Sequence, residues 1–490
     1  MVESNNDVTD ESFVEFSGQQ KETYKDVHIN PDLDPVRKQQ VVELLADFQD
    51  IFTDVPKITN LGEHSIKLTS CEPVRSKAYP LPYVMRSAVD EEVDSMLELG
   101  IIEPSTAPYA SPIVVVKKPD GSNRFCVDYR KLNKITIFDP EPLPQIKDMF
   151  ADLTGCQYFS KFDFSKGYWA VPVNPEDRDL TTFITHRGLF RFKVMPFGLI
   201  NAPATFSRIM RKLLYKLQQL RNYLDDVLAH TGDWKDHLVV LRKFLLKVRE
   251  ANLSLRPSKC FVGYSELTFL GYSLGANGIR PTEDMLDEIK RAPALTTKKQ
   301  LRSFLGLIGY YRSFVPNFAA IAVPLTDLTR KGSPNQLVWG DAQQHAFVSP
   351  KQYVCNPPIL KLPDVSKPFI LQTDASCNSI GAILLQEDEL TKHPVAFASK
   401  KLLPREQNYS TIEREALAIM WGVQKFQNYL YGQHFYLETD HHPLQYLDRA
   451  KFQNSRLMRW ALILRPYRFT VRAIKGVQNV GADFLSRHTC

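Results

Sequence analysis

Two adjacent aspartates, Asp225 and Asp226, lie inside the apolar run LRNYLDDVLAH at 220–230. Adjacent carboxylates repel each other, and apolar surroundings destabilise both charges. Successive side chains of a regular strand point to opposite faces, so the two carboxylates converge only if the chain turns tightly here. Two carboxylates on a buried hairpin tip require a cation. The alternative is that the pair occupies a surface turn or a helix cap.

A third carboxylate, Asp163, ends the alternating strand YFSKFDF at 158–164. Three oxygen-rich ligands without Cys or His favour a hard cation such as Mg²⁺. Two such ions about 3.5–4 Å apart clamp the attacking and leaving oxygens of an in-line phosphoryl displacement. This first group of acids therefore predicts two-metal phosphoryl transfer.

A second group of acids lies in the C-terminal part of the chain. Two members end strands, one borders the apolar stripe of the helix 411–430, and one lies on a short terminal helix: Asp374, Asp440, Glu415 and Asp483. This order resembles that of an RNase H fold. Four convergent carboxylates again imply two Mg²⁺ ions, with Mn²⁺ able to substitute, and hydrolytic phosphodiester cleavage. Any single one of them could instead be a cap or a surface acid, and Glu413 is expected to be solvated.

The elements that must position these acids follow from apolar periodicity and turn chemistry. Helical spacing predicts helices at 36–52, 87–102, 234–253, 298–314 and 411–430. Two β-rich runs flanking PDGS predict a hairpin over 111–133. Pro-rich connectors at 332–336 and 355–364 precede a new β-rich block, so a domain boundary is placed near 365.

The whole-chain composition fits a multidomain protein that binds a polyanion. The chain has 490 residues, 43% of them hydrophobic, and no apolar run approaches a membrane span. Residues 1–60 hold 13 acidic and 5 basic residues, which leaves 42 acidic and 56 basic residues in the remainder. The polar, acidic N-terminus is not expected to be a signal peptide. Seven scattered cysteines indicate reduced thiols and no zinc site.

Six motifs occur in the order and spacing of a reverse transcriptase: SPIVVVKKPDGSNRFCVDYRKLN, KFDFSKGYWAVPV, VMPFGLINAPATF, YLDDVLAH, LRPSKCF and TFLGYSL. Their wording most resembles gypsy-like LTR retrotransposons, with caulimovirus polymerases as near relatives, over about residues 40–490. The resemblance implies an α+β multidomain fold, in which a right-hand polymerase of fingers, palm and thumb precedes an α/β RNase H-like domain with a mixed five-stranded sheet. The predicted parts are an acidic leader or linker (1–35), fingers and palm (36–280), thumb (281–345), connector (346–366) and RNase H domain (367–490).

The resemblance also assigns residues to the incoming nucleotide. Lys118 and Arg124 would hold its triphosphate, with solvated hairpin charges as the alternative. Tyr168 matches the aromatic steric gate against a ribose 2′-hydroxyl, although its pattern alone indicates core. Phe197 and Gly198 match the position that packs on the nucleotide. Lys259 matches the lysine proposed to donate a proton to pyrophosphate, with a solvated loop lysine as the alternative.

The primer-template contacts are assigned in the same way. Residues 269–272 resemble the primer grip: Phe269, Leu270, Gly271 and Tyr272. Arg302, Gly306 and Tyr310 are spaced by four, so they share one helix face and form a candidate minor-groove track. The alternative is that Gly306 only relieves helix packing.

The predicted function is RNA- and DNA-templated DNA synthesis with degradation of RNA in RNA–DNA hybrids. The resemblance implies as partners an RNA–DNA hybrid, a DNA duplex primer-template and dNTPs, but no membrane, in a monomer or homodimer. It implies a cytoplasmic location, within a virus-like particle during replication, and later a nuclear one. Three departures from the family pattern put efficiency in doubt: Ala170, Leu180 and Pro350, the last expected to interrupt a helix at about 3 kcal/mol.

Two alternatives belong to other classes. A degenerate or domesticated copy would bind hybrids with little catalysis, but the acids of both groups are intact. An RNA-dependent RNA polymerase is disfavoured by Tyr168 and by the appended RNase H-like block. The histidine that retroviral RNases H carry about ten residues before the last acid is absent from TVRAIKGVQN, and His441 and His442 are assigned structural contacts rather than catalysis.

Overall fold

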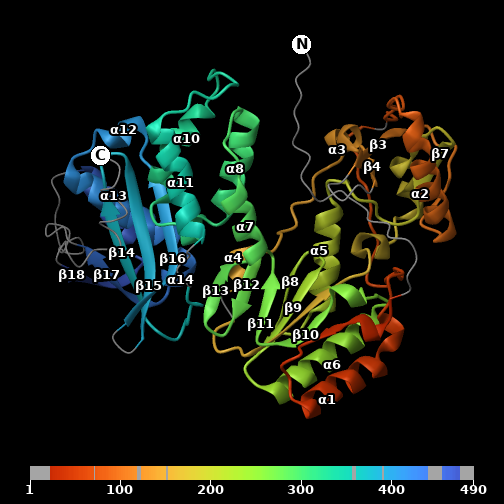
Figure 1. Ribbon diagram of the computed structural model, residues 1–490, viewed down its shortest axis with the longest axis horizontal. Coiled ribbons are helices and arrows are strands. Elements are labelled where there is room, and N and C mark those ends of the chain that lie inside the picture. The colour runs from red at the N-terminus through yellow and green to blue at the C-terminus, as the bar shows by residue number, and fades with distance from the viewer. Residues whose placement is uncertain are drawn as a thin grey trace. The chain divides into compact units, whose positions relative to one another are not determined.

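The computed structural model describes residues 22–70, 72–117, 123–150, 153–355, 360–388, 391–439 and 455–474 (Figure 1). The chain divides into two compact units. The first comprises residues 1–149 and 155–267, and the second comprises residues 150–154 and 268–490. Within the described ranges, no helix has both the length and the apolar character that crossing a membrane would require.

The first unit is built on a five-stranded sheet with the order β1-β10-β5-β9-β8. Its strands are β1 (His28–Ile29), β10 (Phe261–Tyr264), β5 (Tyr158–Asp163), β9 (Asp226–Thr231) and β8 (Leu220–Tyr223). The central strand β5 pairs antiparallel with both β9 and β10. This arrangement leaves the ends of β5 and of the β8–β9 hairpin side by side.

Three helices bury their apolar stripes in the core that includes this sheet: α1 (Pro35–Asp47), α5 (Ala202–Leu213) and α6 (Trp234–Glu250). The side chain of Asp233 caps α6 by accepting from the backbone N–H groups of Lys235 and Asp236. Phe162 of β5 packs against Phe244 of α6 with their ring centroids 5.0 Å apart. The helix thereby supports the back of the strand that ends at Asp163.

A second sheet of the same unit has the order β2-β7-β6-β3-β4. Its strands are β2 (Ile102–Pro104), β7 (Gly188–Phe192), β6 (Phe183–Thr185), β3 (Ser111–Lys117) and β4 (Asn123–Val127). Helix α2 (Arg86–Glu98) shares the core of this sheet. The expected hairpin is present as β3 paired antiparallel with β4, and its turn lies outside the described residues.

The second unit begins with the three-stranded sheet β11 (Glu266–Phe269), β12 (Tyr272–Gly275) and β13 (Gly278–Pro281). Five helices follow: α7 (Glu283–Arg291), α8 (Lys298–Tyr310), α9 (Phe318–Ile321), α10 (Val323–Leu328) and α11 (Asp341–Cys355). The expectation that Pro350 interrupts a helix is wrong, because α11 continues through it. Pro350 is buried with Ala346, Phe347 and Val354, so packing offsets the lost backbone hydrogen bond.

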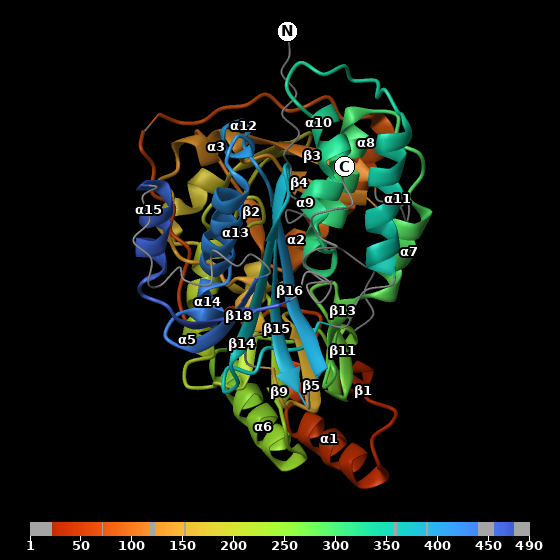
Figure 2. The ribbon, with the colours of Figure 1, turned by 90° about the vertical axis from the view of Figure 1, so that its left-hand side faces the viewer.

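The C-terminal part is a mixed sheet with the order β16-β15-β14-β17-β18, as expected. Its strands are β14 (Phe369–Ala375), β15 (Ser379–Asp388), β16 (Thr391–Lys401), β17 (His434–Thr439) and β18 (Arg468–Ala473). The central strand β14 pairs antiparallel with β15 and parallel with β17. Helix α13 (Thr411–Lys425) runs alongside the sheet (Figure 2), and α15 (Ser455–Leu464) shares its core. The short helices α12 (Pro404–Gln407) and α14 (Gln427–Leu430) flank α13 in sequence.

Candidate active sites

The three acids of the first group come from two paired segments. Asp163 is the last residue of β5 and lies directly opposite Asp226, the first residue of β9. Tyr223 pairs with Asp226, so Leu224 and Asp225 form a two-residue turn between β8 and β9. The tight turn predicted between the two strands of this segment is therefore present, and it lies at Leu224 and Asp225. It brings Asp225 to the end of the sheet beside the other two acids.

The turn holds Leu224 in the left-handed region, with a φ of 52°. This conformation costs an L-residue with a Cβ atom about 1–2 kcal/mol of conformational free energy. The Asn222 side-chain amide donates to the Leu224 carbonyl at 3.3 Å and helps to hold the turn. Strained backbone of this kind persists where the surrounding structure imposes it, and it collects at functional sites.

The carboxylates raise one another's proton affinity. Burial is the largest cause that raises the pKa of Asp225 to about 7, and the charges of Asp163 and Asp226 add to it. Burial also raises the pKa of Asp163, against the opposing charge of Lys259. Near pH 7 the Asp225 carboxyl is therefore partly protonated, whereas an isolated aspartate would be almost fully ionised.

Two lysines neutralise the other two acids. Lys161 Nζ lies 3.1 Å from Asp226 Oδ1, and Lys259 Nζ lies 3.6 Å from Asp163 Oδ2. Lys259 was predicted beside this site, whereas Lys161 was not. Lys161 precedes Asp163 by two residues, and side chains two apart on a strand share a face, so alternation was the signal that could have found it.

In the part of the chain that the structure describes, no three Asp, Glu, His or Cys side chains are gathered closely enough to hold a metal ion. The residue types nevertheless fit a hard cation, because three carboxyl groups lie at one end of the sheet and two ammonium groups there already offset part of their charge. Mg²⁺ needs only one or two carboxylates in addition to substrate phosphates. Asp163, Asp225 and Asp226 would hold it once the ammonium groups move aside.

The residues predicted to contact the nucleotide are described in part. Tyr168 belongs to a 3-10 turn at Gly167–Ala170, and its ring stacks on Phe197 with the centroids 5.0 Å apart and an interplanar angle of 23°. Gly198 has a φ of 90°, a conformation that favours glycine. Lys118 lies outside the described residues. Arg124 lies on β4 opposite Val116, and its side chain is not among those described.

The predicted primer grip is a tight turn between β11 and β12. Leu270 and Gly271 both have positive φ, at 48° and 76°. Two tyrosines of the following segment hold the turn: Tyr310 Oη donates to the Leu270 carbonyl at 2.7 Å, and Tyr311 Oη donates to the Gly271 carbonyl at 2.9 Å. Phe269 is fully buried beneath the turn. Tyr311 was not predicted, although the GYY doublet was the available signal.

Helix α8 places its predicted residues on one exposed face. Arg302 and Gly306 are exposed, Tyr310 is 40% exposed, and the buried residues of the helix lie on the other side. A Cβ atom at Gly306 would meet nothing within 4 Å. Close helix packing therefore does not explain this glycine.

The second group of acids is described in part. Asp374 lies on β14 and Glu415 on α13, and both side chains are buried. Gly422 lets α13 approach β14, because a Cβ there would lie 3.1 Å from Thr373 Cγ2. Asp440 and Asp483 lie outside the described residues, as do His441 and His442.

Two glutamates near this group carry contacts that sequence patterns did not indicate. Glu413 was expected to be solvated, which is wrong: it is buried, caps α13 through Ser410 and accepts from Arg456 at 2.7 Å. Glu438 on β17 is 2% exposed, and it accepts from Lys392 at 2.6 Å and from Gln372 at 2.7 Å. The burial of both glutamates depends on partners that are far away in sequence.

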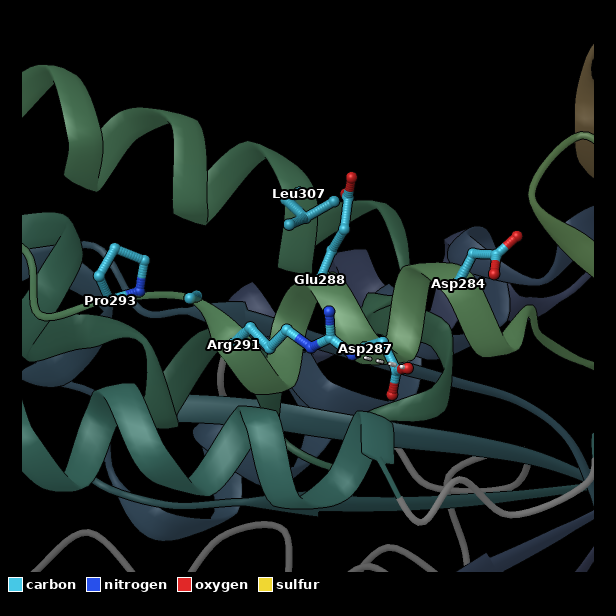
Figure 3. A pocket seen from close by; sticks show the side chains of 7 residues that line it. Asp284, Asp287, Glu288, Arg291, Pro293 and Leu307 are labelled. Atoms are coloured by element: carbon cyan, nitrogen blue, oxygen red, sulfur yellow. Dashed lines mark ion pairs between the residues drawn. The ribbon is translucent and has the colours of Figure 1, made fainter. Parts of the chain in front are cut away.

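A pocket of about 640 Å³ between α7 and α8 holds none of the predicted residues (Figure 3). It is lined by Asp284, Asp287, Glu288, Arg291, Ala292, Pro293 and Leu307. Arg291 pairs with Asp287 at 3.6 Å within the same helix. The pocket is acidic, so it does not suit a phosphate-bearing ligand.

Comparison with known families gives two matches. Residues 116–274 match the family "Reverse transcriptase (RNA-dependent DNA polymerase)", and residues 364–467 match the "RNase H-like domain found in reverse transcriptase". These ranges contain Asp163, Asp225 and Asp226 in the first case and Asp374, Glu415 and Asp440 in the second.

Similar curated proteins are longer than this chain. The retrovirus-related Pol polyprotein from transposon 297 of Drosophila melanogaster is 40% identical over 440 residues, which cover 88% of this chain and 41% of that protein. The corresponding polyprotein from transposon 412 of the same organism is 36% identical, covering 92% and 37%. The transposon Tf2-3 polyprotein of Schizosaccharomyces pombe is 32% identical, covering 92% and 35%. The chain thus spans less than half the length of each of these relatives.

Solved structures support the fold. A foamy viral protease-reverse transcriptase in complex with double-stranded DNA superposes with a TM-score of 0.83 at 24% identity, covering 91% of this chain and 80% of that chain. The same viral protein in complex with an RNA/DNA hybrid gives a TM-score of 0.78 at 24% identity, covering 91% and 61%. At this identity the similarity establishes the fold alone.

Proposed function

Because this chain contains a reverse transcriptase domain followed by an RNase H-like domain and is related to the Pol polyproteins of gypsy-type LTR retrotransposons, we propose that it copies retrotransposon RNA into DNA and degrades the RNA strand of the hybrid. The observation that carries the proposal is the meeting of Asp163, Asp225 and Asp226 at one end of the β5–β9–β8 sheet. A binding protein would have no need for three mutually repelling carboxylates at one point.

In the polymerase site, bound Mg²⁺ would stabilise the charge that develops on the attacking and leaving oxygens of the transferred phosphoryl group. The chain's own residues orient the reactants. Asp163 and Asp226 face each other across paired strands, so their carboxylate positions are fixed by the sheet register. Asp225 would have to be deprotonated to hold the cation, because a proton and a cation compete for the same oxygens.

Contacts with the nucleotide and its pyrophosphate are assigned to five side chains. The Tyr168 ring, stacked on Phe197, would block a ribose 2′-hydroxyl and so favour dNTPs. The Lys259 ammonium group lies beside the Asp163 carboxylate, and it would donate a proton to the departing pyrophosphate. Lys118 and Arg124 would hold the triphosphate from the fingers hairpin.

Hydrolysis of the RNA strand is assigned to the second group of acids. Asp374 and Glu415 are buried on a strand and a helix that pack directly together, and Asp440 and Asp483 complete the proposed set. Mg²⁺ at these acids would supply an activated water and a clamp on the scissile phosphate. The rigid α13–β14 contact would hold the carboxylates in place.

The proposed partners are an RNA–DNA hybrid or DNA duplex and dNTPs, and the chain is proposed to act as a monomer or homodimer. The basic excess of residues 61–490 suits a nucleic-acid duplex. Binding should weaken with salt, with a slope near −0.9 per phosphate contact on a B-form duplex. The proposed location is the cytoplasm, inside a virus-like particle during replication, and later the nucleus; the relationship to retrotransposon Pol polyproteins supports this proposal.

The departures from the family pattern are accommodated in the fold. Ala170 is buried, its carbonyl accepts from the Thr59 N–H at 2.7 Å, and Leu180 packs against the main core. Pro350 leaves α11 continuous. These observations favour the enzyme over a degenerate hybrid-binding copy.

The test is dNTP incorporation on an RNA template with an annealed DNA primer in Mg²⁺, with the template strand followed in the same tube. Asp226→Asn should abolish extension and leave template cleavage intact, because the two acid groups act separately. A wild-type protein that binds the hybrid but extends no primer in Mg²⁺ or Mn²⁺ would replace the enzyme by the hybrid-binding alternative.

A further inference from the structure

Residues 22–30 lie against the loop that carries Lys259, although more than 220 residues separate the two segments. Strand β1 pairs in parallel with β10, with His28 opposite Phe261 and Ile29 opposite Val262. The His28 ring stacks on Phe261 with the centroids 4.6 Å apart. This N-terminal segment precedes the residues matched by either family, so that match gives it no role.

The segment binds both backbone groups of Ser258, which belongs to the 3-10 turn Pro257–Lys259. The Ser258 N–H donates to Glu22 Oε2 at 3.0 Å, and His28 Nε2 donates to the Ser258 carbonyl at 3.1 Å. The Glu22 carboxylate also pairs with Arg256 Nε at 3.3 Å, in a site where the two side chains are 17% and 24% exposed. These contacts hold the turn at Ser258, one residue before Lys259.

The same turn is tied to the acids on its other side. The Arg256 N–H donates to the Asp163 carbonyl at 2.9 Å, and Lys259 Nζ lies 3.6 Å from Asp163 Oδ2. A continuous chain of contacts therefore runs from Glu22 through Arg256 and Ser258 to Lys259 and Asp163. The links from Glu22 through Arg256 to Asp163 join largely buried groups, whereas the Lys259 side chain is 50% exposed, so a displacement at Glu22 moves the turn that carries Lys259.

We propose that residues 22–30 form a positioning strap of the polymerase site, in which Glu22 and His28 fix the turn that holds Lys259 beside Asp163. The inference rests on the proposed function, because it deepens the role of Lys259 as proton donor. A proton donor must lie within hydrogen-bond reach of the leaving group, so a loosened turn lowers the rate of the chemical step. Substrate affinity depends on other side chains and changes little.

The experiment uses the full chain with Glu22→Ala and with Asp47→Asn as the matched control. Asp47 and Arg242 form an ion pair of 3.0 Å on the same unit, far from the turn in sequence. Glu22→Ala should lower kcat for dNTP incorporation about tenfold, with KM for dNTP and RNA cleavage within twofold of wild type. Asp47→Asn should leave all three unchanged. Equal kcat values in the two variants would overturn the strap.

A double-mutant cycle separates positioning from general stability. If Glu22 acts through Lys259, Glu22→Ala should have no further effect on kcat in a Lys259→Ala background. If Glu22→Ala lowers kcat by the same factor in the Lys259→Ala background as in wild type, the proposal is overturned. His28→Phe gives an independent arm, since it retains a ring against Phe261 but loses the hydrogen bond to Ser258, and it should lower kcat in the same direction as Glu22→Ala.

Amide hydrogen exchange of Ser258 provides a readout that needs no activity. The Ser258 N–H should exchange at least tenfold faster in Glu22→Ala, with the amides of α6 unchanged. An unchanged rate at Ser258 overturns the strap alone. Failure of the wild-type protein to extend a primer overturns the proposed function and with it the catalytic role of the strap, so the two failures are distinguishable.

Discussion

Asp163 and Asp226 face each other directly across the antiparallel strands β5 and β9, and each is paired with a different lysine. The register of two buried strands fixes the distance between their backbones, so the repulsion of the carboxylates cannot be relieved by moving apart. It is relieved instead by Lys161, Lys259 and the proton on Asp225. Metal binding at this site would therefore replace the two ammonium groups and the proton by a metal cation.

Asp225→Asn should stabilise the metal-free protein at pH 8. The pKa of Asp225 is about 7 in the native state against an ordinary value of 3.8, so between these pH values the native state binds more protons than the unfolded state. The free energy of unfolding therefore falls as pH rises through this window. A neutral amide removes that loss, which is worth on the order of 1–3 kcal/mol.

The measurement for Asp225→Asn is the melting temperature in EDTA at pH 5 and pH 8. Glu91→Gln, an exposed acid in the middle of α2, serves as the control and should change neither value. Lower stability of Asp225→Asn than of wild type at pH 8 would contradict the burial of this carboxyl. The same variant should lose primer extension, since it removes a ligand.

Lys161→Met should tighten Mg²⁺ binding at the polymerase site. The ammonium group lies 3.1 Å from Asp226 and competes with the metal for its oxygens. At this range its removal is worth about 1–2 kcal/mol, or roughly five- to thirtyfold in affinity. Calorimetric titration with Mg²⁺ measures the change, and Lys235→Met, an exposed lysine on α6, should have no effect. Weaker binding would show that Lys161 orients Asp226 for the metal.

Acid should destabilise the five-stranded sheet that contains β5 and β9, through His237. Burial lowers the pKa of His237 to about 4, and its ring bridges Ser160 of β5 and Thr231 of β9 at 2.8 and 2.9 Å. The unfolded chain binds more protons than the native state between about pH 6.5 and 4, so stability falls as pH falls through this range. His237→Gln should show a shallower fall.

Urea unfolding followed by tryptophan fluorescence at pH 5 and pH 7.5 checks the His237 prediction. His64, also buried with a pKa lowered to about 4, keeps part of the slope in the variant. His345→Gln removes an exposed histidine and should reproduce the wild-type profile. A steeper fall in His237→Gln would contradict the prediction.

Gly422→Ala should impair RNA cleavage selectively. The added Cβ would lie 3.1 Å from Thr373 Cγ2 and 3.2 Å from Ala382 Cβ, so α13 must move away from β14. Overpacking of this kind costs about 1–3 kcal/mol and would separate Glu415 from Asp374. We expect at least a tenfold loss of hybrid cleavage with primer extension retained. Equal losses of both activities would indicate a global folding defect.

Gly306→Ala should strengthen α8 and weaken hybrid binding. The substitution meets no atom within 4 Å, and alanine favours a helix over glycine by about 1 kcal/mol. If the exposed face of Arg302, Gly306 and Tyr310 follows a duplex, the added methyl group holds the backbone away from it. Gly309→Ala lies on the same helix with equally open surroundings and is the matched control. Equal affinities of the two variants in a fluorescence anisotropy assay would exclude the track.

Local patterns were sufficient for the elements that carry the acids. Alternation predicted β5, the apolar run around Asp225 predicted the β8–β9 turn, and helical spacing predicted α13, because each depends on burial within one segment. The mixed five-stranded sheet followed from the resemblance and is confirmed. The prediction for Pro350 was wrong because the free-energy cost of a proline in a helix can be recognised from the sequence, whereas the burial that offsets it cannot.

What could not be predicted depends on pairing between distant segments. Glu413 is buried at the start of α13, where Arg456 on the later helix α15 donates to it at 2.7 Å. Lys161 reaches Asp226 only through the β5–β9 register. The strap of residues 22–30 exists only because β1 pairs with β10, and no periodicity within two residues of strand could indicate that.

Asp163 and Asp374 each lie on a central strand, which pairs with a neighbour on both sides. Edge strands such as β8 and β18 lose hydrogen bonds to solvent first, whereas a central strand opens only when its sheet comes apart. As the protein is heated, the strand that carries Asp163 and the strand that carries Asp374 should thus outlast the edge strands of their own sheets. Inactivation would then report the collapse of a sheet rather than the fraying of its edges.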